Sequence, residues 1–373
     1  MKRVATALVV VCWLTLLHTV SAHAQVPVTQ PWSLALVAGS FYDNTGTGEE
    51  RRGDFGGTLQ ANLTRSLSFG PRGNLTLSGN ISEDFYDLRH TSYGLSVSGS
   101  YAITRRLSWT ISDTVNSSFG QHDKLLTDAG LVYPNTETLS HGLSTSLTYL
   151  LSRATDVHVA VASQSVGFDS SILTGGSNAS GTFGLGRRVT PLQTLAVNYQ
   201  YERTFTDVGA AVIQGVSATW HLTKQRASFN ATGGAQAYTQ PGQDSYSFTP
   251  ASSLGWTLQL NSTHSLGLSY SNTAEQAFGF NRTAITQTVA GTYGLSYRRM
   301  TISFAGNYSR STSQSSIDAV LVGEVGSASV QYRIASRLSL VMDSSVYSTR
   351  QIRSPAASGY RAGVSLSYTK NFR

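Results

Sequence analysis

The stretch Leu95-Ser-Val-Ser-Gly-Ser-Tyr101 alternates between an apolar, aromatic or glycine residue and a serine. Successive side chains of an extended strand point to opposite faces, so Leu95, Val97 and Tyr101 share one face and the serines share the other. The stretches 75–82 and 253–260 repeat this pattern. A period of two over such a length predicts β-strands that have one apolar face and one small polar face.

The alternation continues from about residue 32 to the end of the chain, with no convincing helical stretch. We count eighteen strands, and sixteen also fit, because boundaries read from a sequence are good only to a few residues. Each segment is long enough to cross a bilayer as a tilted strand of ~9–11 residues. The strands are expected near 32–42, 55–64, 73–86, 92–103, 107–117, 139–151, 156–168, 179–189, 193–205, 211–222, 226–239, 246–260, 265–277, 283–297, 300–310, 319–333, 337–349 and 359–372.

Short, similar connections join the expected strands in pairs, which makes an internal repeat. Each has an apolar residue, a few polar or basic residues and a second apolar residue, as in Ile103–Leu107 and Ile334–Leu338. An even strand number with both termini on the short-turn side is the arrangement of bacterial outer-membrane barrels. The eight short turns are expected within 64–74, 103–108, 151–157, 187–194, 222–226, 260–266, 297–302 and 334–338.

The N-terminus has the three parts of a secretory signal peptide. Lys2 and Arg3 precede an apolar segment, 4–17, and the small-residue cleavage site Ser21–Ala24. We therefore divide the chain into a cleaved signal peptide, 1–24, and a mature barrel, 25–373. The only cysteine, Cys12, lies in the signal peptide, so the mature fold is expected to hold no disulfide.

The composition and the two strand faces indicate a membrane. Only 13% of the residues are charged, whereas a soluble globular protein carries roughly a quarter. A soluble barrel exposes Lys and Glu, but here the second face is Ser, Thr, Gly, Asn and Gln. The expected fold class is all-β: a transmembrane antiparallel up-and-down β-barrel in the outer membrane, with apolar residues toward lipid and polar residues toward the lumen.

The last expected strand carries an aromatic pattern of its own. Leu366, Tyr368 and Phe372 share one face, which Lys370 interrupts. This resembles the C-terminal signature of outer-membrane barrels, and the resemblance implies that the barrel assembly machinery reads Tyr368 and Phe372. Arg373 after the last aromatic departs from the signature. With the strand repeat, the mature chain resembles porin-like outer-membrane barrels over its whole length, a resemblance of architecture that names no substrate.

An eighteen-stranded barrel encloses an aqueous lumen unless something plugs it, because barrel diameter grows with strand number. The longest connection, near 118–138, is the third external loop. In many porins that loop folds inward, and this resemblance makes Asp123, Lys124 and Asp128 candidate constriction charges. The alternative role for this loop is to cap the mouth.

The expected lumen wall consists mainly of Ser, Thr, Gly and Asn. The candidate lumen charges on it are Asp84, Glu202, Asp343 and Arg361. A wide and mostly neutral lumen sieves solutes by size and selects weakly by charge. Asp113 falls on the apolar face of its strand, and a bulge or a position near the membrane interface would account for it.

Basic residues gather at or beside the short turns and at the C-terminus, with Asp156 the one acid among them. Their expected partners are outer-membrane lipid headgroups or, as a sharper hypothesis, an acidic periplasmic protein. A homo-oligomer is a further candidate assembly, and nucleic acid is not expected, since no second basic stripe adjoins the turns. The basic residues are Arg65, Arg72, Arg105, Arg106, Arg153, Arg187, Arg188, Lys224, Arg226, Arg298, Arg299, Arg333, Arg337, Lys370 and Arg373.

We interpret the sequence as a porin-like channel for passive diffusion of small hydrophilic solutes. One alternative is the barrel component of an exopolysaccharide export system, which Ser/Thr-rich barrels of this type resemble; another is a structural or adhesive barrel with an occluded lumen. An exporter is expected to show a ladder of charged or aromatic residues, and the sequence shows no clear one. No G-x-S-x-G elbow, HExxH pair or Walker loop occurs, so we expect no enzyme, cofactor or metal site.

Overall fold

The computed structural model describes most of the chain. The predicted signal peptide, 1–24, lies outside the described residues, and so do the candidate constriction residues Asp123, Lys124 and Asp128. The described ranges are 28–29, 32–47, 50–85, 89–119, 137–169, 174–277, 282–312, 321–351 and 357–372.

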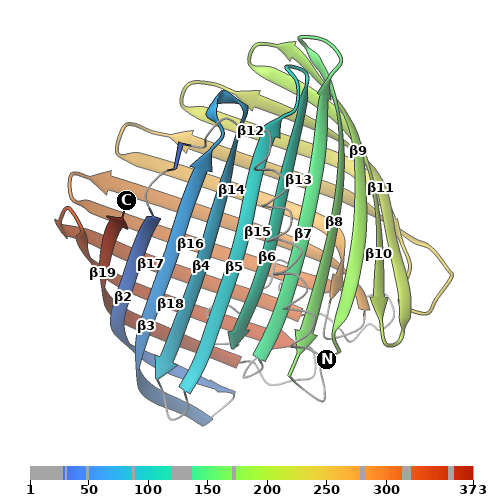
Figure 1. Cartoon of the computed structure of the whole chain (residues 1–373). Helices are drawn as coiled ribbons and strands as arrows, with labels where there is room; N and C mark the ends of the chain where they lie inside the picture. Colours follow the sequence, from blue (N-terminus) through green and yellow to red (C-terminus); the bar gives the residue numbers. More distant parts are fainter. Residues whose placement is uncertain are drawn as a thin grey trace.

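Eighteen long antiparallel strands, β2 to β19, form one closed sheet in which each strand pairs with its sequence neighbours (Figure 1). The sheet closes because β19 pairs with β2 from Trp32 opposite Phe372 to Thr47 opposite Ala357. This confirms the predicted up-and-down barrel and its strand count. The strands are β2 Trp32–Thr47, β3 Glu50–Ser68, β4 Gly73–Phe85, β5 Arg89–Ala102, β6 Leu107–Phe119, β7 Glu137–Leu150, β8 Thr155–Phe168, β9 Gly176–Thr190, β10 Gln193–Thr206, β11 Gly209–Thr223, β12 Ala227–Tyr238, β13 Ser247–Gln259, β14 His264–Ala277, β15 Arg282–Tyr297, β16 Met300–Thr312, β17 Leu321–Ala335, β18 Leu338–Gln351 and β19 Ala357–Phe372.

A two-residue strand, β1 (Val28–Thr29), precedes the barrel strands and pairs with β3. Val28 stands opposite Ser68, and β2 takes over along the same edge of β3 from Ser33 opposite Thr64. The two registers differ by one residue, so β1 continues the line of β2 after a small irregularity. It is therefore not a nineteenth strand of the wall.

The first hairpin departs most from the prediction. Strands were expected at 32–42 and 55–64, but β2 and β3 pair as far as Thr47 opposite Glu50. The Gly-, Asn- and Arg-rich segment between them has the composition of a loop, yet ladder hydrogen bonds come from the backbone, which every residue except proline supplies in full. The prediction from composition was therefore wrong here: it ended the first strand too early and began the second too late.

Seven of the eight short turns share one backbone contact. The carbonyl of the last turn residue accepts a hydrogen bond of 2.7–2.9 Å from the strand beyond, as Arg106 O does from Leu150 N and Arg337 O from Thr369 N. Each turn thus adds one rung to the ladder and satisfies its own backbone at the rim. The eighth turn holds a short 3-10 helix, η1 (Gly70–Arg72), which the sequence did not predict; Gly70 enters it at a φ of 65° that glycine tolerates. Within the described part of the chain, no helix is long and apolar enough to span a membrane.

The strand registers set the width of the barrel. A path that passes from each residue to its paired residue on the next strand returns to the first strand about 22 residues away from where it began. This displacement is the shear number of the barrel. With a strand spacing of ~4.8 Å and a rise of ~3.3 Å per residue, that shear corresponds to a tilt of about 40° and a mean backbone diameter of about 35 Å. The backbone cylinder is thus wide enough to enclose a lumen.

Candidate functional site

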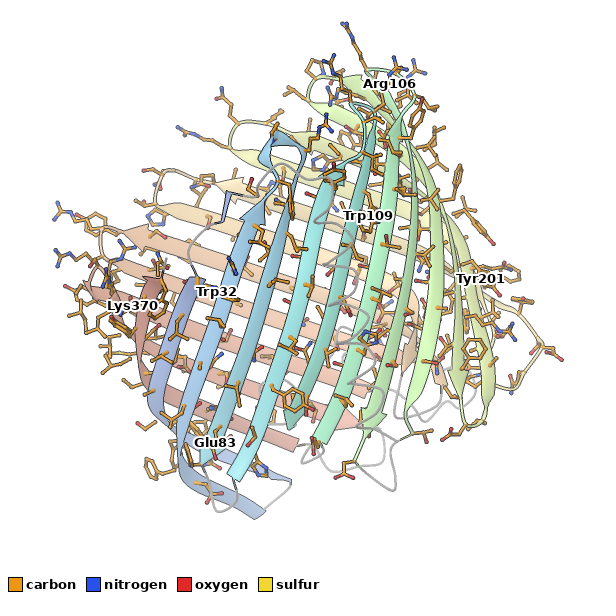
Figure 2. All side chains as sticks on the ribbon, in the orientation of Figure 1. Trp32, Glu83, Arg106, Trp109, Tyr201 and Lys370 are labelled. Atoms are coloured by element: carbon orange, nitrogen blue, oxygen red, sulfur yellow. The ribbon has the colours of Figure 1, made fainter. Side chains whose placement is uncertain are left out.

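Alternation along the strands gives the wall an outer and an inner face, and the outer face is apolar. Its large side chains are exposed in the single chain, for example Leu95 (57%), Phe304 (50%) and Leu366 (48%). Figure 2 shows Tyr201 and Lys370 at this outer surface. Hydrocarbon is the solvent that fits an apolar belt around a sheet without open edges. The chain is an outer-membrane β-barrel.

Aromatic side chains mark both rims of the belt, as expected where a barrel meets the two membrane interfaces. In barrels of this kind the short turns are periplasmic and the longer loops extracellular. At the extracellular rim, the rings of Tyr42 and Phe55 pack with centroids 4.8 Å apart. At the periplasmic rim, the Arg65 guanidinium lies 4.9 Å from the Trp32 ring centroid. The two aromatic girdles therefore mark the upper and lower limits of the membrane-spanning part of the wall.

The predicted assembly-signal residues, Tyr368 and Phe372, both lie on the outer face of β19. Lys370, which interrupts this face in the sequence, places its amine 4.8 Å from the Phe372 ring centroid. The Lys370 amine therefore makes a cation–π contact with Phe372, so this charge does not interrupt the aromatic girdle. Reading of these residues by the assembly machinery stays a prediction.

The inner face is lined by hydroxyl side chains that hydrogen-bond in pairs. Residues directly opposite each other on neighbouring strands form them, such as Ser78 with Ser96 (2.5 Å) and Thr110 with Ser146 (2.6 Å). A hydroxyl both donates and accepts, so each pair keeps capacity to bind water. The wall is therefore polar where it carries no charge. The other pairs are Ser66–Thr76, Thr219–Thr232, Ser228–Thr257, Thr286–Ser311 and Ser303–Ser329.

Two of the candidate lumen charges lie near the extracellular end of the inner face and have close partners. Glu202 on β10 accepts hydrogen bonds from Asn178 Nδ2 (3.0 Å) and Thr204 Oγ1 (3.4 Å). Arg361 on β19 lies with its guanidinium 3.9 Å from the Phe41 ring centroid and stands opposite Asp43 in the register. Both side chains are therefore held against the wall.

The other two candidates also lie on the inner face. Asp84 on β4 stands opposite His90 near the extracellular end. Asp343 on β18 lies deeper, opposite Gly363, where the missing Cβ leaves room for the carboxylate. Of the four, only Asp343 and Arg361 are on adjacent strands, so the structure distributes these charges around the lumen and does not gather them into one site.

The regular wall is interrupted at the extracellular mouth. β13 and β14 pair only from Ser252 opposite Asn272 downward. Above that point β12 bonds directly to β14 and β15: Ala274 N donates to Gln236 Oε1 (2.8 Å), and Thr283 Oγ1 donates to Thr239 O (2.8 Å). We call this region the mouth seam, formed by Gln236, Tyr238, Thr239, Gln240, Ala274 and Thr283.

In the mouth seam, the extracellular ends of β14 and β15 lie on the lumen side of β12. Strand alternation points Ala274 and Thr283 outward, yet their exposed fractions are 4% and 1%. Ala274 packs against Ile213 and Tyr238, whose side chains point inward from β11 and β12. The outward-pointing side chain of Ala274 can contact the inward-pointing side chains of Ile213 and Tyr238 only if β14 lies inside β11 and β12 as a second layer. The wall is therefore double here, and the ends of β14 and β15 narrow the mouth.

Sequence reasoning missed the mouth seam, although one residue signals it. The predicted strand 246–260 contains Pro250, and proline lacks the N–H of a ladder residue and belongs on a sheet edge. In the structure, residues from Ser247 to Ala251 pair with β12 alone, so β13 is an edge there. The Pro250 carbonyl accepts a hydrogen bond from Asn272 Nδ2 (2.7 Å), which joins the two strands where the ladder ends.

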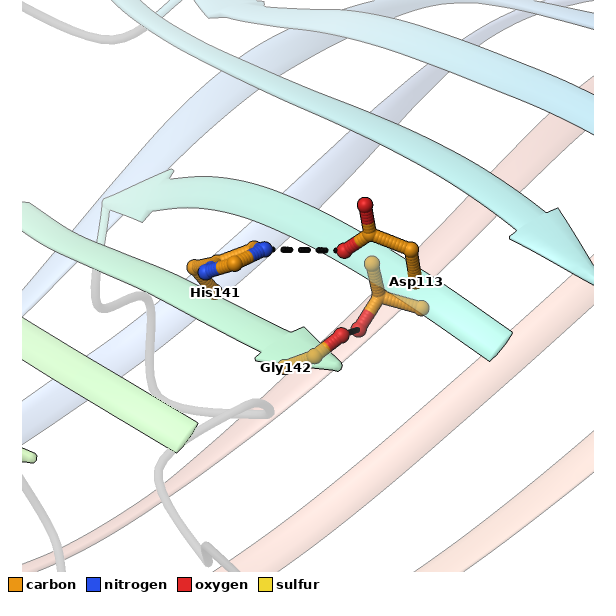
Figure 3. Close-up of polar contacts among 4 residues, drawn as sticks. Asp113, His141 and Gly142 are labelled. Atoms are coloured by element: carbon orange, nitrogen blue, oxygen red, sulfur yellow. Dashed lines mark hydrogen bonds and ion pairs between the residues drawn. The ribbon is translucent and has the colours of Figure 1, made fainter. Parts of the chain in front are cut away.

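Asp113 lies on the outer face, opposite Val97 and Leu143, in a strand that pairs without a bulge. It is six residues from either end of β6, so a bulge and a position near the interface are both wrong explanations for it. Its Oδ1 is 2.8 Å from His141 Nε2 on β7, and its exposed fraction is 7%. Figure 3 shows the two side chains pointing toward each other from neighbouring strands. On the described part of the outer face, Asp113 and His141 thus place an ionisable pair in the middle of the apolar belt.

No family model matches this sequence, and no curated protein does. Several solved barrels resemble the structure. OccAB4 of Acinetobacter baumannii is 11% identical with a TM-score of 0.49, over 92% of this chain and 99% of that chain. OpdQ of Pseudomonas aeruginosa is 10% identical with a TM-score of 0.49, over 92% and 98%. The siderophore receptor PirA of Pseudomonas aeruginosa is 9% identical with a TM-score of 0.45, over 92% and 80%. With TM-scores below 0.5, these likenesses carry no argument about what this barrel does.

Proposed function

We propose that the barrel is a channel for the passive diffusion of small hydrophilic solutes across the outer membrane. The inner wall carries this proposal: paired hydroxyls line it on strands from β3 to β17. A lumen inside a backbone cylinder about 35 Å across admits water against such a wall. Because the described wall charges are few and spread apart, the pore is expected to select mainly by size.

The polymer-export alternative has less support from the described wall. A polymer guide needs aromatic or charged residues in an axial series. The inward-facing aromatics among the described residues do not form such a series: Phe168, Tyr238 and Tyr347 lie near the extracellular ends of their strands, and Phe41, deeper on β2, is covered by the Arg361 guanidinium. We therefore propose a diffusion channel in preference to a polymer guide.

Single-channel recording of the refolded mature barrel in a planar bilayer tests this function. We expect large, steady conductance steps with weak ion selectivity. Neutral polymers of graded size should reduce the conductance only below a size limit. A folded, heat-modifiable barrel that gives no steps would overturn the open channel.

A matched pair of cysteine variants shows whether the current passes through the lumen. Ser98→Cys places a thiol on the inner face, and Val97→Cys places one on the outer face of the same strand. A bulky water-soluble thiol reagent should lower the conductance of Ser98→Cys and leave that of Val97→Cys unchanged. Equal behaviour of the two variants would mean that ions do not follow the inner wall.

A further inference from the structure

Asp113 and His141 depart from a rule that the rest of the outer face obeys. The other outward-facing Asp, Glu, Lys, Arg and His side chains that the structure describes lie within three residues of a strand end, as Glu83 and Lys370 do. Asp113 is six residues from both ends of β6, and His141 is four from the nearer end of β7. At ~3.3 Å per residue and a tilt of about 40°, Asp113 lies about 15 Å from the strand end, close to the middle of a belt ~25 Å tall.

The pair belongs to a polar patch that extends over three strands. On β8, Ser165 stands opposite His141 and Ser163 opposite Leu143, both on the outer face. Toward the extracellular rim, Ser117 Oγ donates a hydrogen bond to Glu137 Oε1 (3.1 Å). At the depth of Asp113 the neighbouring strand β5 is apolar, with Val97 opposite it. We define the outer polar patch as Asp113, Ser117, Glu137, His141, Ser163 and Ser165.

Hydrocarbon is an unfavourable neighbour for this patch. Ionisable side chains within a membrane are rare, and they normally face protein or water. The Asp113 carboxylate is covered, but 35% of the His141 side chain is exposed, and Ser163 and Ser165 are exposed as well. Among the described residues, Asp113 is the hydrogen-bond partner of His141, through Nε2. The patch is therefore a surface that needs a polar neighbour at membrane depth.

We propose that a second copy of this chain packs on the outer polar patch, giving a twofold dimer in the membrane. Copies inserted in the same orientation carry the patch at the same depth, and rotation about the membrane normal preserves that depth. Groups at the same depth meet across such an axis, and the exposed Ser163 and Ser165 hydroxyls, which both donate and accept, can hydrogen-bond with the partner copy's hydroxyls or with the exposed part of its His141. The small side chains of Ser163 and Ser165 let two walls approach closely. This assembly does not depend on whether the lumen conducts.

The double variant Asp113→Leu/His141→Leu tests the dimer. Replacing both partners leaves no unpaired charge, so the variant barrel is expected to fold and to stay heat-modifiable. Sedimentation in mild detergent should give twice the chain mass for the unmodified barrel and a single chain mass for the variant, with the dimer fraction reduced on the order of tenfold. The control Ser344→Leu, on the outer face of β18 outside the patch, should remain dimeric.

Cross-linking in the membrane locates the contact. Ser163→Cys lies in the patch, and Val289→Cys lies on the outer face of β15, where Val289 is 49% exposed. A short bifunctional thiol reagent should join two chains through position 163 and not through position 289. The proposal is overturned by an unmodified barrel that remains monomeric in lipid vesicles, or by equal cross-linking at both positions. Phospholipid hydrolysis that the double variant loses would also overturn it, because the pair would then be a catalytic site facing lipid.

Discussion

The two rims of the barrel are built in different ways. At the periplasmic rim, turns of two to four residues repeat one backbone contact, and the strands stay paired up to the turns, with one-residue register shifts next to Gln193 and Arg333. At the extracellular rim, β13 parts from β14, and the mouth seam joins residues such as Gln236 and Ala274 that lie 38 positions apart in the sequence. A tight turn fixes the register of its own two strands. Local sequence therefore determines the periplasmic rim, whereas contacts across strands determine the extracellular rim.

The charged groups of the lumen follow the same division. Asp84, Glu202 and Arg361 lie near the extracellular ends of their strands. The periplasmic rim is predominantly basic, and Asp156 is the acid described there. A solute that crosses the barrel therefore meets the mixed charges of a narrowed mouth first and a cationic rim last. Substitutions at the two ends should therefore change the unfolding free energy by different amounts and shift the ion selectivity in opposite directions.

The largest effect is expected in the mouth seam. Tyr238 is 1% exposed and forms its apolar cluster with Ile213 and Ala274. Tyr238→Ala should lower the free energy of unfolding in lipid vesicles by about 3–5 kcal/mol, the usual loss for truncating a buried aromatic residue. It should also raise the single-channel conductance, because the ends of β14 and β15 that narrow the mouth lose their packing against Tyr238. Urea unfolding and bilayer recording measure the two changes.

Tyr246→Ala is the matched control for the mouth seam. Tyr246 precedes β13 in the same region, and it is 49% exposed. Its truncation should change neither the unfolding free energy nor the conductance beyond the scatter of the measurement. If the two variants behaved alike, the double layer at the mouth would not be a stabilising contact.

A smaller effect is expected inside the regular wall. A Cβ at Gly234 on β12 would overlap the Val216 carbonyl oxygen and Ser217 Cα, which belong to the backbone of the neighbouring strand β11 and cannot move aside. Gly234→Val should therefore destabilise the barrel by about 1–3 kcal/mol, as overpacking usually does. Gly233→Val is the control on the same strand, since a Cβ there meets nothing within 4 Å and points toward lipid. A loss of stability in the control equal to that in Gly234→Val would show that the clash does not cause the effect.

The sequence was sufficient to predict the wall because each strand obeys a rule of its own. The period of two from Leu95 to Tyr101 predicts which side chains lie on the apolar face and which on the polar face, and the repeated turns predict that the strands pair in sequence order. Within the membrane every backbone group must pair, so a regular antiparallel ladder follows from the strand list alone. The eighteen strands and their order in the barrel could be predicted in this way.

The rest depends on contacts that no local pattern encodes. The partners of Glu202 come from β9 and from its own strand, and the mouth seam joins β12 to strands beyond its neighbour β13. Pro250 was the local sign of an edge, but it did not tell which strand would cover that edge. Likewise, the misplaced polarity of Asp113 was visible in the sequence, while its partner His141 became apparent only when β6 and β7 were paired.

The lumen charges should alter ion selectivity more than stability. Glu202→Gln removes a negative charge from the inner face near the mouth, so the ratio of cation to anion permeability should fall, by about twofold. Arg188→Gln, on the inner face at the periplasmic end of β9, should move the ratio in the opposite direction. Reversal potentials in a salt gradient measure both. Glu83→Gln on the outer face is the control, and a shift as large as that of Glu202→Gln would mean that the lumen charge is not what the ions sense.

The smallest effect is expected at the periplasmic turns, where Arg105 and Arg106 are exposed. The double variant Arg105→Gln/Arg106→Gln should change the unfolding free energy by less than about 0.5 kcal/mol in neutral vesicles, as surface substitutions do. In vesicles with anionic lipid the loss should rise toward about 1 kcal/mol per cation, because each loses attraction to the charged surface. Arg203→Gln at the extracellular end of β10 is the control with one cation removed. If the turn variant lost a captured periplasmic protein and showed no dependence on anionic lipid, the turns would instead be the docking site of an acidic partner.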